Sequence, residues 1–363
     1  MAGPPRRHHY VTKSYLDGFV EPNEGLLFCY GRKKSKAFRA LPENLAHIRD
    51  YHSFKREDGT LDFTLETQID QQIESPGIPL IRTLSEGKTN LGKTQRLCLA
   101  KFIALQNVRV PYERDFMDQQ HKVILEGYLA DMDEESRKRG FPVNAIEVAV
   151  NVSGREPKLH EWQRVTRDFV NAELREIEAD QQRFSRESFF DLAEKLAKTI
   201  SGLRWTVFYG TGEARFITSD CPVITRDKNE RRYFPGLDNF DTEVYFPLSK
   251  KALIRMGHDN SCQLLPRKKQ IHRQKRVMRA QTQEIIVVQA DEQVVQSLNE
   301  LIVARAHLWT VSGARQDWLL ERMQQPSKIQ KRTKAIVQSG SMTTNQAGQR
   351  LLTKKEFVVL VDT

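Results

Sequence analysis

The chain has 363 residues, of which 39% are hydrophobic and 29% are charged. This composition supports a sizeable core and carries too much charge for an integral membrane protein. We find no run of about 18 apolar residues and no apolar stretch after the N-terminus, so we expect neither a transmembrane helix nor a secretory signal. We therefore expect a cytoplasmic protein with no membrane partner. Its four cysteines, none of them spaced as C-x-x-C, are typical of isolated reduced thiols.

The first predicted module covers residues 1–90 and mixes short strands, turns and helices. A strand is predicted at 26–30, and a helix at 65–73, where apolar residues recur every four positions. Ser75-Pro76-Gly77 is typical of a helix breaker, after which a helix resumes at 78–84.

The second predicted module, residues 91–200, is helical. Apolar residues surround the helix at 97–108 almost completely, which is typical of a buried central helix. Pro111 ends or kinks it. A long, charged helix follows at 113–139, and further amphipathic helices run to residue 200.

The third predicted module, residues 201–321, is rich in strands. Strands at 205–209 and 214–217 are expected to form a hairpin through the turn at 210–212, and Asp291 is the predicted N-cap of a late helix. Further strands are expected at 223–224, 244–246, 252–254 and 284–288. The last part, 322–363, is basic and polar, with a linker or mobile tail at 322–355 and a possible strand at 356–361. This order predicts an α+β fold: a mixed N-terminal module, a helical middle and a strand-rich C-terminal half.

Positive charge is concentrated in a few segments. The chain has 57 Lys and Arg against 47 Asp and Glu, a net charge of +10. One segment has seven cations and no acid: Arg267, Lys268, Lys269, Arg273, Lys275, Arg276 and Arg279. Such a cluster favours binding to the phosphates of DNA or RNA. The alternative is a solvated surface, which applies equally to a smaller cluster between Arg32 and Arg39.

Three carboxylates are spaced four residues apart along the helix predicted around 65–73 and the residue after it: Glu66, Asp70 and Glu74. Carboxylates one turn apart are suitable ligands for Mg²⁺ or another divalent cation, and the alternative is a solvated acidic edge. Arg109 interrupts the buried helix together with Gln106, and a buried guanidinium needs a carboxylate partner. We expect Arg109 either to pair with Glu66 or Glu74, or to bind a phosphate.

Asp220 follows a predicted strand and precedes Pro222, a position where carboxylates often act in catalysis. A histidine near the N-terminus, His8 or His9, is a candidate general base. The alternative is that Ser219 and Asp220 cap the turn before Pro222. The candidate catalytic residues are thus His9, Glu66, Glu74, Arg109 and Asp220, and the candidate metal ligands are Glu66, Asp70, Glu74 and Asp220. We expect a histidine, Asp220 and one glutamate to face a common cleft.

Five motifs occur in order along residues 8 to about 310. They are His9-x-Val11 with Tyr15-Leu16 and Phe19, the pair Glu66 and Glu74, Gln106-x-x-Arg109-x-Pro111, Thr218-Ser219-Asp220-x-Pro222-Val223 and Phe246-Pro247-Leu248-Ser249. The set resembles the bacterial domain-of-unknown-function family 4238. Thr12, Cys221 and Lys250 stand where that family often has proline, asparagine and proline. The resemblance implies a shared fold and assigns no catalytic residue.

Together these observations predict a protein that acts on nucleic acid, such as a metal-dependent phosphodiester hydrolase. The kind of family it resembles suggests a bacterial defence or toxin role. The alternatives are a non-catalytic nucleic-acid-binding or regulatory protein, and an enzyme acting on a small nucleotide. Dependence of activity on a divalent metal separates the first two, and a dialysable ligand would favour the third.

Overall fold

The computed structural model describes most of the chain and confirms the α+β class. It forms two compact units, one built from residues 1–113 and 189–331, the other from 114–188 and 332–363. The described residues are 6–56, 58–138, 168–177, 180, 183–228, 236–237, 239, 241–258, 284–325, 334–344 and 350–360. Within them, no helix is long and apolar enough to cross a membrane.

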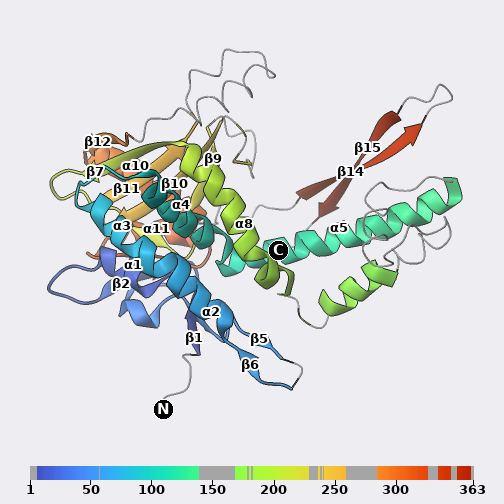
Figure 1. Cartoon of the computed structure of the whole chain (residues 1–363). Helices are drawn as coiled ribbons and strands as arrows, with labels where there is room; N and C mark the ends of the chain where they lie inside the picture. The colour runs from blue at the N-terminus through green and yellow to red at the C-terminus, as the bar shows by residue number, and fades with distance from the viewer. Residues whose placement is uncertain are drawn as a thin grey trace. The chain divides into compact units, whose positions relative to one another are not determined.

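A five-stranded sheet forms the centre of the first unit (Figure 1). Its neighbours pair antiparallel except β12, which runs parallel to β7. In spatial order the strands are β12 (Ile286–Ala290), β7 (Arg204–Gly210), β11 (Ala252–Gly257), β10 (Thr242–Ser249) and β9 (Ile224–Asp227). Every residue of β10 is buried, as expected for a strand covered on both faces.

Helices cover both faces of this sheet. On one face lie α3 (Ser75–Ser85) and α4 (Lys93–Val108), drawn in front of the strands in Figure 1. There Phe102 of α4 contacts Phe246 edge to face, with 6.2 Å between ring centroids. On the other face α10 (Glu292–Arg305) shares a hydrophobic cluster with Tyr245 of β10. The alternation of Tyr245 and Phe246 thus anchors one helical layer on each side.

A second sheet brings distant parts of the chain together. Its order is β3 (Phe38–Ala40), β2 (Leu27–Gly31), β13 (Trp309–Ser312) and β8 (Thr218–Ser219). Two small ladders pair β1 (Arg7–His9) with β4 (His47–Arg49), and β5 (Phe54–Lys55) with β6 (Leu61–Asp62). Short helices complete the first unit: α1 (Lys13–Leu16), η1 (Asp17–Phe19), η2 (Pro42–Asn44) and α11 (Asp317–Gln324).

The predicted break at residues 75–77 is absent: these residues begin a regular helix, inside a continuous helical segment that has a π-helical turn directly before them. The segment consists of α2 (Thr64–Ile69), the π turn η3 (Asp70–Glu74) and α3. Pro76 is the second residue of α3 and lies directly after the π turn. Gly77 lets α3 approach α4 closely, since a Cβ there would lie 2.8 Å from the ring of Phe102.

Other predicted helices are confirmed. The buried helix is α4, and the charged helix is α5 (Pro111–Lys138), for which Pro111 is the first residue. The segment at the end of the predicted helical module is α8 (Arg183–Gly202). Asp291 caps α10, because its side chain accepts a hydrogen bond of 2.9 Å from the backbone N–H of Val294.

Two predictions about strands are wrong. Residues 214–217 form no hairpin with β7, because β11 and β12 pair with β7 on its two sides. The N–H of Ile217 instead donates to Asn299 Oδ1. The predicted linker at 322–355 contains the end of α11 and most of a hairpin in the second unit, β14 (Lys334–Thr344) and β15 (Arg350–Leu360). The polar composition of these residues gave no strand signal, because the two strands are paired through their backbones along their whole length.

Candidate functional site

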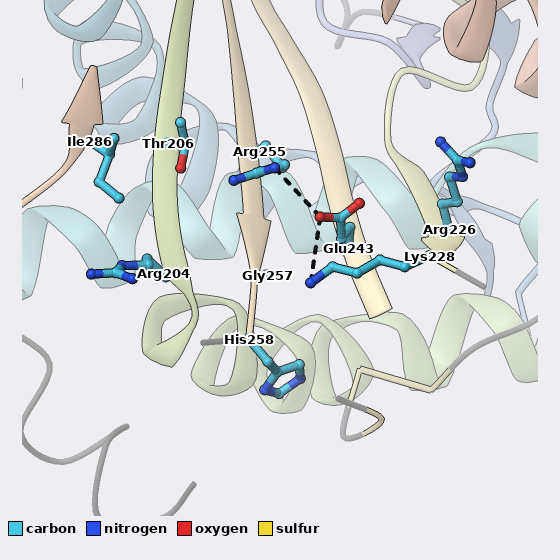
Figure 2. Close-up of a pocket in the computed structure, with 9 residues that line it drawn as sticks. All are labelled: Arg204, Thr206, Arg226, Lys228, Glu243, Arg255, Gly257, His258 and Ile286. Carbon is cyan, nitrogen blue, oxygen red and sulfur yellow. Dashed lines mark ion pairs between the residues drawn. The ribbon is translucent and has the colours of Figure 1, made fainter. Parts of the chain in front are cut away.

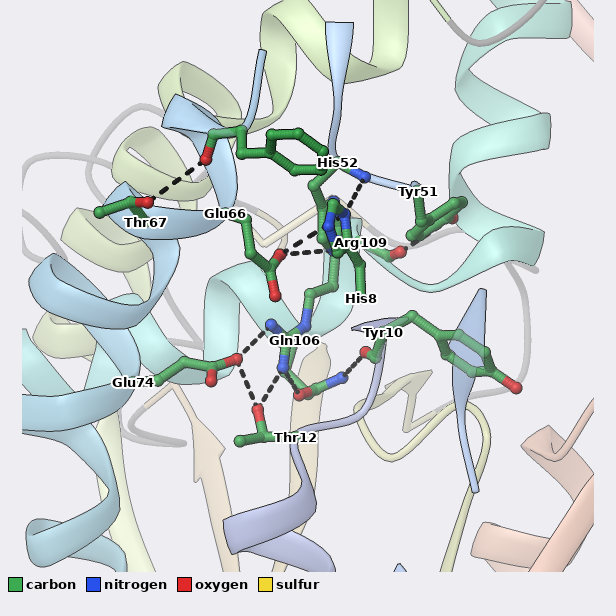
Figure 3. A network of polar contacts seen from close by, with 11 residues as sticks. His8, Tyr10, Thr12, Tyr51, His52, Glu66, Thr67, Glu74, Gln106 and Arg109 are labelled. Carbon is green, nitrogen blue, oxygen red and sulfur yellow. Dashed lines mark hydrogen bonds and ion pairs between the residues drawn. The ribbon is translucent and has the colours of Figure 1, made fainter. Parts of the chain in front are cut away.

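A buried polar network surrounds Arg109, the residue that ends α4 (Figure 3). Arg109 is 1% exposed, and its guanidinium donates to Glu74 Oε1 at 2.5 Å, to Gln106 Oε1 at 2.7 Å and to the hydroxyl of Thr12. Thr12 in turn donates to Glu74 Oε1, and Gln106 Nε2 donates to the carbonyl of Tyr10 at 2.6 Å. The predicted brace between Arg109 and a glutamate is therefore confirmed, with Glu74 as its partner.

The π turn explains why Glu66 and Glu74 share this network while Asp70 does not. In a regular α-helix, residues eight apart are rotated by about 80° relative to each other. A π turn takes more residues than an α turn and offsets this rotation. Glu66 and Glu74 consequently both point towards Arg109 (Figure 3), whereas Asp70 is exposed and accepts a hydrogen bond of 3.1 Å from Ser75.

Two buried histidines lie against Glu66. The rings of His8 and His52 stack with 5.8 Å between centroids, and the backbone N–H of His52 donates to His8 Nδ1 at 2.9 Å. Glu66 Oε2 lies 3.9 Å from His8 Nδ1 and 4.0 Å from His52 Nε2. Burial raises the pKa of Glu66 to about 7, although nearby Arg109 opposes the shift. Glu66 is therefore poised to exchange a proton near neutral pH.

The predicted catalytic histidine, His9, lies on the opposite side of β1 from His8. Its Nε2 is 3.3 Å from the carbonyl of Glu43, and its ring contacts His47. Side chains alternate along a strand, so only one of two consecutive histidines can face Glu66. Recognition of residues 7–9 as a strand could have pointed to this choice. No feature of the sequence singles out His52.

Asp220 has a separate structural role. Its carboxylate accepts hydrogen bonds from the backbone N–H groups of His307 at 3.0 Å and Leu308 at 2.6 Å, and its own N–H donates to Trp309. Burial raises the pKa of Asp220 to about 6 despite these donors. Asp220 thus caps backbone groups, but those of the distant segment before β13 and not those of the turn beside Pro222 that the sequence offered as the alternative.

The structure does not assemble the predicted metal ligands into one site. Among the described residues, no group of three or more His, Cys, Asp and Glu side chains is placed to hold a metal ion. Glu74 is engaged by Arg109 and Thr12, Asp70 lies at the surface, and Asp220 binds backbone groups. This geometry differs from the common cleft expected from the sequence, and binding of Mg²⁺ stays a prediction.

A second candidate site is a basic hollow of about 430 Å³ on the five-stranded sheet (Figure 2). Its lining comes from two rungs of strand pairs that are two residues apart along each strand, so the side chains project from one face of the sheet. In one rung Glu243 pairs with Arg226 and with Gly257, and in the other Arg255 pairs with Thr206. The lining residues are Arg204, Thr206, Arg226, Lys228, Glu243, Arg255, Gly257, His258 and Ile286.

Among the described residues that line it, the hollow is positively charged and has one carboxylate. Four Lys or Arg side chains line it against the single Glu243, whose Oε1 lies 3.7 Å from Lys228 Nζ and 3.6 Å from Arg255 Nη1. The hydroxyl of Tyr245 donates to Glu243 Oε2 at 2.5 Å. Burial and Glu243 raise the pKa of Tyr245, which keeps this donor protonated. An anionic ligand suits such a site.

Sequence reasoning missed the hollow because its cations come from different strands and form no contiguous run. A signal was present, since basic residues occur two apart at Arg226 and Lys228, and Arg255 interrupts the apolar strand β11. The predicted cluster at 267–279 lies outside the described residues. In the sequence, it falls between His258 and Ile286, two residues of the hollow.

The motifs noted in the sequence meet in the structure. The hydroxyl of Tyr15, from the first motif, is 2.8 Å from the Thr218 hydroxyl and donates to the carbonyl of Pro247 at 2.9 Å. The family described as "Protein of unknown function (DUF4238)" matches residues 7–316 of the chain. This range includes every one of these motifs. No curated protein and no solved structure matches the chain. By the extent of this match, the chain belongs to the DUF4238 family.

Proposed function

We propose that this protein binds nucleic acid through the basic hollow. The observation that supports the proposal is the clustering of four Lys and Arg side chains, from or beside three strands of one sheet face, around the carboxylate of Glu243. Cations fixed on a sheet meet a phosphate backbone with little loss of side-chain freedom, and each contact releases counterions. The net charge of +10 favours the approach of the same partner.

Neutralising the hollow is expected to weaken binding of a single-stranded oligonucleotide at least tenfold. The variant is Arg204→Gln/Arg226→Gln/Lys228→Gln, and fluorescence anisotropy across a salt series provides the measurement. Loss of three phosphate contacts should also reduce the slope of log Kd against log salt by about 2.

A matched control changes the formal charge equally at exposed sites elsewhere. Lys88→Gln/Lys198→Gln/Arg315→Gln removes three cations whose side chains are 72%, 71% and 70% exposed. We expect this control to bind within about threefold of wild type. If both triple variants lose the same affinity, net charge alone governs binding and the hollow is not the site.

Hydrolysis at Glu66 is a second candidate function. The observation that favours it is a carboxyl group whose pKa is raised to about 7, beside two imidazoles, with 26% of its side chain exposed. In its protonated form Glu66 could donate to the leaving oxygen of a phosphodiester. Arg109 neutralises Glu74, which makes Glu74 a poor ligand for Mg²⁺. A role in bacterial defence stays a prediction.

Cleavage of labelled RNA and DNA, measured from pH 5 to 9 with Mg²⁺ or with EDTA, tests this second candidate. A general acid must be protonated, so activity should be present below pH 7 and fall as the pH rises above it. Glu66→Gln should abolish activity, while Asp70→Asn, an exposed neighbour on the same helical segment, should not. Equal loss in both variants together with sensitivity to EDTA would instead favour the metal site predicted from the sequence.

A further inference from the structure

The carboxylate of Glu243 lies in the basic hollow, and its two oxygens differ in the contacts that they make. Glu243 is 7% exposed, and its Oε2 accepts the hydroxyl hydrogen of Tyr245. Its Oε1 faces Lys228 and Arg255 at 3.7 and 3.6 Å, distances that suit ion pairs but exceed those of hydrogen bonds. In the part of the chain that the structure describes, this oxygen accepts no hydrogen bond. Figure 2 shows it directed between the two cations.

This carboxylate restricts the ligands that the hollow can take. A bare phosphate would be attracted by the cations but repelled by Glu243. A ligand that carries a hydrogen-bond donor close to its phosphate satisfies both kinds of group, because the donor reaches Oε1 while the phosphate contacts Lys or Arg. A volume of about 430 Å³ lies in the range of small-ligand pockets, so it suits one nucleotide unit rather than a duplex.

We propose that the hollow selects single-stranded RNA, with Glu243 Oε1 accepting a hydrogen bond from the ribose 2′-hydroxyl of one nucleotide. The inference rests on the nucleic-acid binding proposed above and names its substrate class. The 2′-hydroxyl is the group by which proteins distinguish RNA from DNA at a given position, and single strands leave it accessible. Tyr245 fixes the carboxylate through Oε2, which leaves Oε1 oriented for this donor.

An exocyclic amino group of a base is the other donor that a nucleotide offers to a carboxylate. Oligouridylates separate the two donors, because uracil has no exocyclic amino group. The probes are therefore oligomers of uridine, deoxyuridine and 2′-O-methyluridine of equal length, with oligocytidylate and oligodeoxycytidylate as additional arms. All are measured by anisotropy at one salt concentration.

Wild-type protein is expected to bind oligouridylate about tenfold more tightly than its deoxy and 2′-O-methyl counterparts. Glu243→Gln should reduce this ratio to below about threefold, because a neutral amide oxygen is a weaker acceptor than a carboxylate. The matched control is Glu213→Gln, at a fully exposed side chain. It adds the same charge, so it leaves the ratio unchanged even where it alters both affinities.

Equal binding of the three uridine oligomers by wild type would overturn the inference, as would an unchanged ratio in folded Glu243→Gln. A preference for cytidine over uridine in both RNA and DNA would assign Glu243 to a base amino group and would equally overturn it. Should Glu243→Gln not fold, Tyr245→Phe releases the carboxylate and is expected to lower the ratio at least twofold. The proposed function fails separately, through unchanged binding when Arg204, Arg226 and Lys228 are neutralised.

Discussion

Replacing Arg109 by alanine is expected to destabilise the protein by about 3–5 kcal/mol, because it empties a buried position and leaves the half-buried carboxylate of Glu74 without its cation. Glu74 would lose the guanidinium, and Gln106 and Thr12 would each lose a donor. Equilibrium unfolding in urea measures the loss. Lys101→Ala on the same helix provides a control, since its ion pair with Glu194 is partly exposed and should contribute no more than about 1 kcal/mol.

A double variant tests whether the buried charge is the cause. In Arg109→Met/Glu74→Gln neither partner is charged, so we expect it to be more stable than Arg109→Ala. If Arg109→Ala unfolds like wild type but no longer binds nucleic acid, the brace is not what Arg109 provides. The alternative noted from the sequence, in which Arg109 binds a phosphate, then takes its place.

Replacing Arg32 by alanine is expected to cost about 2–4 kcal/mol, because its guanidinium caps the ends of two helices. It donates to the carbonyls of Val303 and Ala306 at the end of α10, at 2.7 and 2.8 Å, and to that of Gln325 just after α11 at 2.7 Å. The last carbonyls of a helix find no donor within the helix, and alanine offers none in place of the guanidinium. Thermal unfolding monitored by circular dichroism measures the effect.

Arg39 is the matched control for Arg32, since both belong to the same predicted basic cluster. Arg39 is exposed and pairs with Glu24, so Arg39→Ala should change stability by less than about 1 kcal/mol. Arg32→Lys keeps the charge but loses the planar fork, and should recover only part of the stability. Equal effects of Arg32→Ala and Arg39→Ala would contradict the capping role of Arg32. They would favour the solvated surface that was the alternative for this cluster.

The features that could be predicted from the sequence are those governed by local pattern. The apolar surround of α4 indicated its burial, and burial of Arg109 required an acidic partner. Asp291 acts on a backbone N–H three residues ahead, so its cap is also a local property. In each case the cause lies within one element or follows from the cost of an unpaired buried charge.

The features that could not be predicted depend on which strands become neighbours. The hollow exists only because Arg226, Glu243 and Gly257 fall in one rung, and no local pattern contains that register. Asp220 likewise takes its role from backbone groups 87 and 88 residues away. His52 reaches Glu66 through a loop whose path the sequence does not reveal.

The four-stranded sheet has a consequence for how the chain folds during synthesis. β2 pairs with β13, so Leu27–Gly31 has no ladder partner on that side until Trp309–Ser312 has been made. At about 5–20 residues per second, the ribosome takes roughly 15–55 s to cover this separation. For that time Leu27 and Cys29, which are fully buried in the folded protein, lack their final neighbours. Completion of the first unit therefore waits until Ser312 has been made, and a chaperone that shields the early strands would be of most use before then.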